Sequence, residues 1–120
     1  MTSQQPSRER RLHVRVRPAT DYELKIAHVD GAIRTQLLVV DISLGGVGLL
    51  LDEITDKHKV GDTITLHISP PVGKAFQCQA SVRHLSTRTS VVGIRLELSK
   101  EDSTTLDRVV SELLTRGNMA

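Results

Sequence analysis

Apolar and polar residues alternate along several short stretches of the chain, as they do in β-strands that bury one face. The alternation covers residues 21–26, 33–43, 63–68, 76–83 and 94–98, and residues 47–51 form a further short apolar stretch. Turn-forming pairs such as Asp30-Gly31 and Gly61-Asp62 separate these stretches. The pattern predicts a mainly β fold, a closed or nearly closed six-stranded antiparallel β-barrel.

The last part of the chain changes to helical spacing. Ser99 is a typical helix N-cap, followed by acidic residues, and Gly117 is a typical C-terminal stop. Between them an apolar stripe is formed by Leu106, Val109, Val110, Leu113 and Leu114. We therefore expect a C-terminal α-helix that lies across the barrel and covers an opening. Packing on the core is favoured over contact with a partner, which stays open as the alternative.

The length of 120 residues fits one domain with a core of its own. Cys78 is the one cysteine, so the chain forms neither an internal disulfide nor a cysteine-based zinc site, and the residue is interpreted as structural. Aliphatic runs are far too short to span a membrane, and the first residues lack the apolar core of a signal peptide. We expect a soluble protein of the cytoplasm.

Positive charge is concentrated in the first 17 residues. They contain five arginines against one glutamate, a net charge of +4, whereas the other 103 residues carry 11 bases and 13 acids. We therefore divide the chain into a flexible basic arm (1–17), a domain (18–116) and a short tail (117–120). Such an arm predicts an anionic partner, because the planar fork of arginine binds phosphate or the edge of guanine bidentately.

Two segments have the chemistry of a guanine nucleotide site. Arg11 and Arg15, four residues apart, can hold a wide anion or converge on one ligand. Asp41 and Ser43 alternate with apolar neighbours, so both are expected to point outward, and the glycines after them leave the backbone open. A carboxylate accepts from the N1 and N2 edge of guanine, and arginine donates to its O6 and N7.

The chain resembles the PilZ domain family of bacterial receptors for cyclic di-GMP. The resemblance rests on Arg11-Leu-His-Val-Arg15 for the RxxxR motif and on Asp41-Ile-Ser-Leu-Gly-Gly46 for the [DN]xSxxG motif. It implies that Arg11 and Arg15 clasp the phosphates and a guanine, that Asp41 and Ser43 contact the ligand from the barrel, and that Gly46 keeps the floor open. It also implies that Arg10 can stack on guanine when an intercalated ligand dimer binds. The arm would close over the ligand.

The leading hypothesis is a cyclic di-GMP receptor or adaptor that acts on a downstream protein and needs no further cofactor. One alternative is a PilZ-like interaction adaptor that binds no nucleotide. Another is a nucleic-acid-binding barrel, which is disfavoured because one Tyr, one Phe and no Trp leave almost no stacking surface. Five scattered histidines lack metal-ligand spacing, and no nucleophile lies beside a base, so neither a metal site nor an enzyme is predicted. Ser81 or Arg83 could border the ligand.

Overall fold

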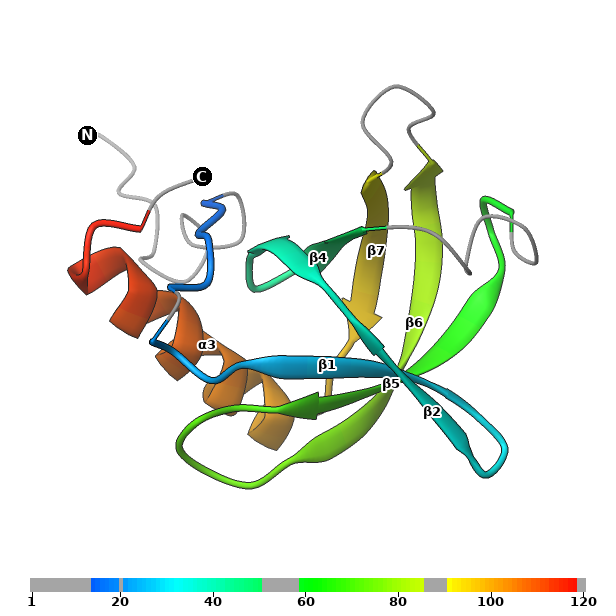
Figure 1. The fold of residues 1–120 in the computed structure, drawn as a ribbon, viewed down its shortest axis with the longest axis horizontal. Coiled ribbons are helices and arrows are strands. Elements are labelled where there is room, and N and C mark those ends of the chain that lie inside the picture. The colour runs from blue at the N-terminus through cyan, green and yellow to red at the C-terminus, as the bar shows by residue number, and fades with distance from the viewer. Residues whose placement is uncertain (1–13, 20, 51–58, 86–90, 119–120) are drawn as a thin grey trace, which may run out of the picture.

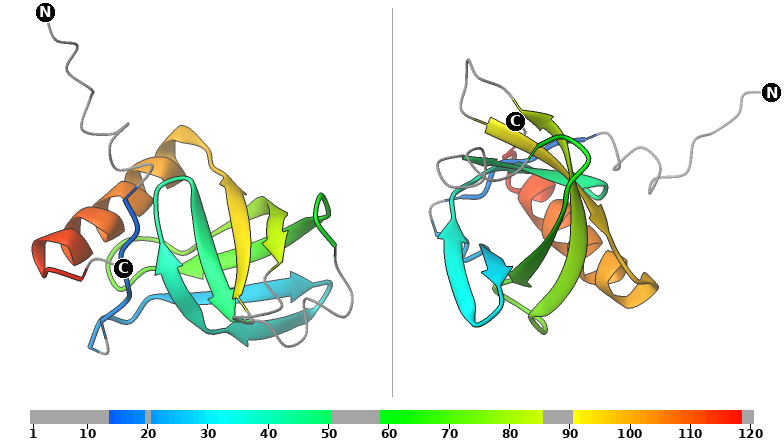
Figure 2. Two further views of the ribbon diagram at one scale, coloured as in Figure 1. Left: turned by 90° about the horizontal axis from the view of Figure 1, so that it is seen from above. Right: turned by 90° about the vertical axis from the view of Figure 1, so that its right-hand side faces the viewer.

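The computed structural model describes residues 14–19, 21–50, 59–85 and 91–118. Its strands are β1 (Lys25–Asp30), β2 (Ile33–Leu37), β3 (Val39–Ile42), β4 (Gly46–Leu50), β5 (Thr63–Ser69), β6 (Phe76–Leu85) and β7 (Val91–Glu97). They are followed by the helix α3 (Lys100–Thr115). Figures 1 and 2 show a curled sheet with α3 lying across one end of it. The predicted mainly β fold with a C-terminal helix is confirmed.

All strand pairs in the sheet are antiparallel, in the order β2-β1-β5-β6-β7-β4-β3. β2 and β3 are therefore the two edge strands, although Leu38 alone separates them along the chain. One residue cannot cross a flat sheet of seven strands, which would be about 29 Å wide at the usual strand spacing. The sheet must curl until its edges approach each other, and the result is a half-barrel.

The predicted single strand over 33–43 is thus two strands, so the sheet has seven strands instead of six. Leu38 is 64% exposed and interrupts the alternation, and its carbonyl accepts a hydrogen bond from Leu50 N. β2 pairs with β1 on one side of this break, and β3 pairs with β4 on the other. The first strand also begins later than residue 21 because a turn, closed by a hydrogen bond from Tyr22 N to Ala19 O, precedes it.

The core lies between the concave face of the sheet and the helix. Alternate residues of β5, β6 and β7 are buried, as the sequence predicts. The helix adds Leu106, Val109, Val110 and Leu113 to the same cluster. At its N-terminus Ser99 Oγ accepts a hydrogen bond from Asp102 N at 3.1 Å, and Gly117 ends it with a φ of 79°.

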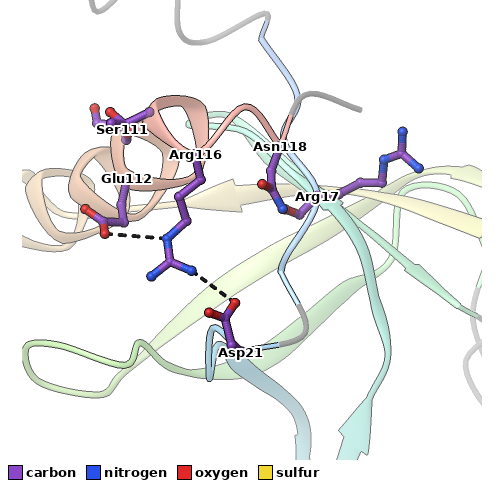
Figure 3. A network of polar contacts seen from close by, with 7 residues as sticks. Arg17, Asp21, Ser111, Glu112, Arg116 and Asn118 are labelled. Carbon is purple, nitrogen blue, oxygen red and sulfur yellow. Dashed lines mark hydrogen bonds and ion pairs between the residues drawn. The ribbon is translucent and has the colours of Figure 1, made fainter.

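The C-terminal end of α3 holds the chain that leads into β1 (Figure 3). Arg17 N donates to Asn118 O at 2.8 Å, and Asn118 Nδ2 donates to Arg17 O at 3.3 Å. Arg116 pairs with Asp21 at 3.1 Å and lies 5.2 Å from the centre of the Tyr22 ring. Burial and the carboxylate of Glu112 raise the pKa of Tyr22, and Arg116 opposes them. These contacts hold Arg17, Asp21 and Tyr22 against the end of the helix.

The Cys78 thiol lies in the core on β6. Burial raises its pKa to about 11, and the carboxylates of Asp102 and Glu97 add to the shift. We therefore expect unfolding free energy to fall as pH rises from about 9 to about 11, because the unfolded thiol ionises first. Denaturant titrations at several pH values, compared with Cys78→Ala, measure this effect. If the variant lost stability over the same interval just as steeply, Cys78 would not be the cause.

Candidate ligand-binding site

The segment that carries Arg15 lies along the edge of β3. Val16 forms an antiparallel bridge with Ile42, in which each backbone N–H donates to the carbonyl of the other at 2.9 Å. The Val16 side chain is fully buried, so its neighbour Arg15 points away from the core. Residues 14–17, included in the predicted arm because of their charge, are thus anchored on the domain by an apolar side chain.

Arg15 and Asp41 meet on the outer surface of the sheet. Arg15 Nη1 donates to Asp41 Oδ1 at 2.6 Å, and the two side chains are 49% and 20% exposed. The pair joins the two predicted motif segments, which are 26 residues apart in the sequence. Arg10 and Arg11 lie outside the described residues.

Two glycines of β4 have different steric roles. A Cβ atom on Gly48, which lies opposite Asp41, would be 2.7 Å from Asp41 Oδ1. Gly48 therefore makes room for the carboxylate. A Cβ atom on Gly46 would be 2.4 Å from the backbone oxygen of Ile94, so Gly46 allows β4 to approach β7 closely. The glycine of the motif thus has a packing role in the sheet.

Ser43 does not point outward as predicted. β3 ends at Ile42, and the chain then turns back into β4, so the strand alternation no longer applies. The Ser43 residue is only 4% exposed, and both its N–H and its hydroxyl donate to Gly46 O, at 2.9 and 3.3 Å. In this structure the hydroxyl closes the turn that shapes the rim of the site.

Beside this turn the surface has an open hollow of about 230 Å³. Arginine and glycine dominate its lining, which consists of Arg15, Ser43, Gly45, Gly46, Arg83, His84, Gly93, Ile94 and Arg95. The hollow brings together three of the predicted residues, Arg15, Ser43 and Gly46, and Asp41 stands next to it through its contact with Arg15. Its walls are cationic and can hold an anion.

Sequence reasoning missed His84, Gly93 and Arg95, while Arg83 was considered. Arg95 is one of the outward-facing residues of β7, so the alternation of apolar and polar residues could have identified it. His84 was hidden by a bulge, because the pairing of β6 with β7 shifts between Val82 and His84. Ser81 lies opposite Arg95 but does not line the hollow.

The described residues contain no group of three His, Cys, Asp or Glu side chains that could hold a metal ion. Likewise, in the described ranges no helix is long and apolar enough to cross a membrane.

Comparison with known proteins decides the family. The family model of the PilZ domain matches residues 9–112 of the chain. The chain belongs to the PilZ domain family. Its match includes both motif segments, so the PilZ assignment rests on the residues that form the site as well as on the fold. No match is found among curated proteins.

Solved structures agree with the PilZ fold. The PilZ domain with c-di-GMP of YcgR from Escherichia coli has a TM-score of 0.59 and 17% identity, over 86% of this chain and 90% of that one. The PilZ domain of CeSA from a cellulose-synthesizing bacterium has a TM-score of 0.55 and 19% identity, over 82% and 96%. The inhibitor of motility MotI/DgrA from Bacillus subtilis has a TM-score of 0.63 and 18% identity over 86% of this chain, which spans 50% of that protein. At these identities the likeness concerns the fold.

Proposed function

We propose that this PilZ domain is a receptor for cyclic di-GMP that passes ligand occupancy on to another protein and catalyses no reaction. The observation that carries the proposal is the contact between Arg15 and Asp41, which places the two motifs together at the edge of a cationic hollow. The domain of YcgR, which shares the fold, is described with c-di-GMP. The proposed setting is the bacterial cytoplasm, where a free thiol such as Cys78 stays reduced.

The chemistry of the site suits a guanine dinucleotide. The Asp41 carboxylate accepts from the N1 and N2 donors of guanine, and the Arg15 guanidinium donates to phosphate oxygens or to O6 and N7. In the free chain these groups satisfy each other at 2.6 Å. A ligand must therefore supply both a donor pair and an acceptor pair to replace the contact, and a guanine nucleotide has both.

The size of the hollow indicates how the ligand is held. Its volume of about 230 Å³ is below the 300–1,000 Å³ typical of pockets that enclose small ligands. A cyclic dinucleotide would therefore be enclosed only in part by the described surface. The proposed closure of the arm, with Arg10 and Arg11, would cover the remainder and create the new surface for a downstream partner.

Isothermal titration calorimetry with cyclic di-GMP, GMP and single-stranded RNA tests the proposal. We expect cyclic di-GMP to bind in a salt-sensitive manner and GMP to bind at least tenfold more weakly, because a second phosphate and base add contacts. Tighter binding of single-stranded RNA than of cyclic di-GMP would support the nucleic-acid alternative. Absence of binding by all three would contradict the receptor proposal and favour an adaptor that uses no nucleotide.

Asp41→Ala should weaken cyclic di-GMP binding by about 1.5–3 kcal/mol, the usual worth of a hydrogen bond to a charged group. Asp41→Asn should lose less, because the amide keeps one acceptor and the family motif admits asparagine. The same calorimetric titration measures both variants. Asp30→Ala, which removes an exposed carboxylate from the distant end of β1, is the matched control and should bind as the parent does. Equal affinity of Asp41→Ala and the parent would refute the guanine-edge assignment.

A further inference from the structure

The side of the hollow opposite the motif residues is built by β6 and β7. Ser81 pairs with Arg95 and Val82 with Ile94, and after the bulge His84 pairs with Gly93. Val82 and Ile94 are buried in the core, whereas Arg83, His84 and Arg95 are exposed. The extra residue of the bulge is Arg83, and it joins His84 and Arg95 in the lining of the hollow. We refer to these three residues as the β6–β7 wall.

Two glycines separate this wall from Asp41 along one row of the sheet. The strand registers place Asp41 opposite Gly48, Gly48 opposite Gly93, and Gly93 opposite His84. Four neighbouring strands at about 4.8 Å spacing set Asp41 and His84 roughly 14 Å apart along this row. The two positions between them are glycines: Gly48 is buried, with the Asp41 carboxylate and the Val91 side chain over it, whereas Gly93 is partly exposed and lines the hollow.

Arg15 and the β6–β7 wall differ in how far their charge is compensated. Arg15 is neutralised by Asp41. Arg83 and Arg95 form no ion pair with any described residue, and the described lining of the hollow contains no carboxylate. The uncompensated positive charge of the hollow therefore lies on the β6–β7 wall, and an approaching anion is attracted there first.

We propose that the β6–β7 wall is a second phosphate-binding element, which holds the phosphodiester of the ligand that is farthest from Asp41. The inference rests on the proposed receptor function and assigns roles to residues outside both motifs. Arg83 and Arg95 bind one phosphate of a cyclic dinucleotide while Arg15, on the other side of the hollow, binds the second. The wall then favours a ligand with two phosphates, because a mononucleotide has one phosphate and leaves either Arg15 or the wall without one.

The test is calorimetric titration of the full chain with cyclic di-GMP after Arg83→Ala, Arg95→Ala and both together. Each single variant should weaken binding about tenfold or more, and the affinity should depend less steeply on salt concentration. Arg34→Ala is the matched control, because Arg34 is an exposed strand arginine outside the lining of this hollow. Its affinity should stay within about twofold of the parent. Arg83→Lys separates charge from geometry and should recover only part of the loss.

Thermal unfolding of the same variants should match the parent, because the replaced side chains are exposed. If the parent binds cyclic di-GMP and both alanine variants bind equally well, the wall has no part in binding and this inference is overturned, while the receptor function stands. If the parent itself binds no cyclic di-GMP, both the receptor function and the inference about the wall fail.

Discussion

Replacing Arg15 by alanine should weaken cyclic di-GMP binding by about 10- to 150-fold, the equivalent of one or more hydrogen bonds to charged groups. Arg15 supplies the guanidinium at the junction of the two motifs, and removing it leaves Asp41 without its partner. The side chain is 49% exposed, so its ion pair adds at most about 1 kcal/mol to the stability of the domain. Calorimetry measures the affinity, and thermal unfolding shows that the fold is retained.

Arg11→Ala should have a comparable effect on binding, because Arg11 occupies the other arginine position of the motif. Arg11 lies outside the described residues, so this expectation depends on the family and not on a contact. Arg34→Ala again provides a control with the same loss of charge at a remote exposed position. Undiminished affinity in Arg15→Ala would remove the central claim about the site.

The second large effect concerns Gly46→Ala, which should destabilise the domain by about 1–3 kcal/mol. The new methyl group would be 2.4 Å from the Ile94 backbone oxygen, and neither strand backbone can move aside easily. The expected result in a thermal scan is a loss of several degrees in Tm, roughly 4–8 °C per kcal/mol for a domain of this size. Any loss of ligand affinity would follow from the distorted β4–β7 pairing.

Gly48→Ala is the matched comparison on the same strand. Here the methyl group would be 2.7 Å from Asp41 Oδ1, the end of a side chain that can turn away. We therefore expect a smaller loss of Tm but a clear loss of cyclic di-GMP affinity, because the carboxylate leaves its place. The reverse ranking, with Gly48→Ala less stable than Gly46→Ala, would show that the roles of the two glycines are exchanged.

The strands and the helix could be predicted because each buries one face, so that its apolar residues recur at the spacing of a strand or of a helix. The break at Leu38 could not be predicted, because leucine is an apolar residue in the sequence whether it points inward or, as here, is 64% exposed. Strand pairing makes the break, since the residues on either side of Leu38 join opposite edges of the sheet. Alternation describes a single strand and carries no information about its neighbours.

The candidate site also combines residues that the sequence predicts with residues that only the fold reveals. Asp41 lies next to the buried Ile42 and points outward, although the pairing of β3 with β4 shifts between Val39 and Asp41, whereas Ser43 comes after the end of the strand and turns inward. Residues of the β6–β7 wall reach the site through cross-strand register and one bulge, neither of which is visible in the local sequence. The motif positions could be predicted from the sequence, whereas the β6–β7 wall could be found only from the fold.

The hydrogen bonds between Arg17 and Asn118 give the domain a property of practical use. Asn118, after the end of α3, is thus adjacent to the segment that carries Arg15, so a protein fused after residue 118 would begin close to the proposed binding site. The domain therefore suits construction of a fluorescent biosensor in which ligand binding alters a reporter fused after α3.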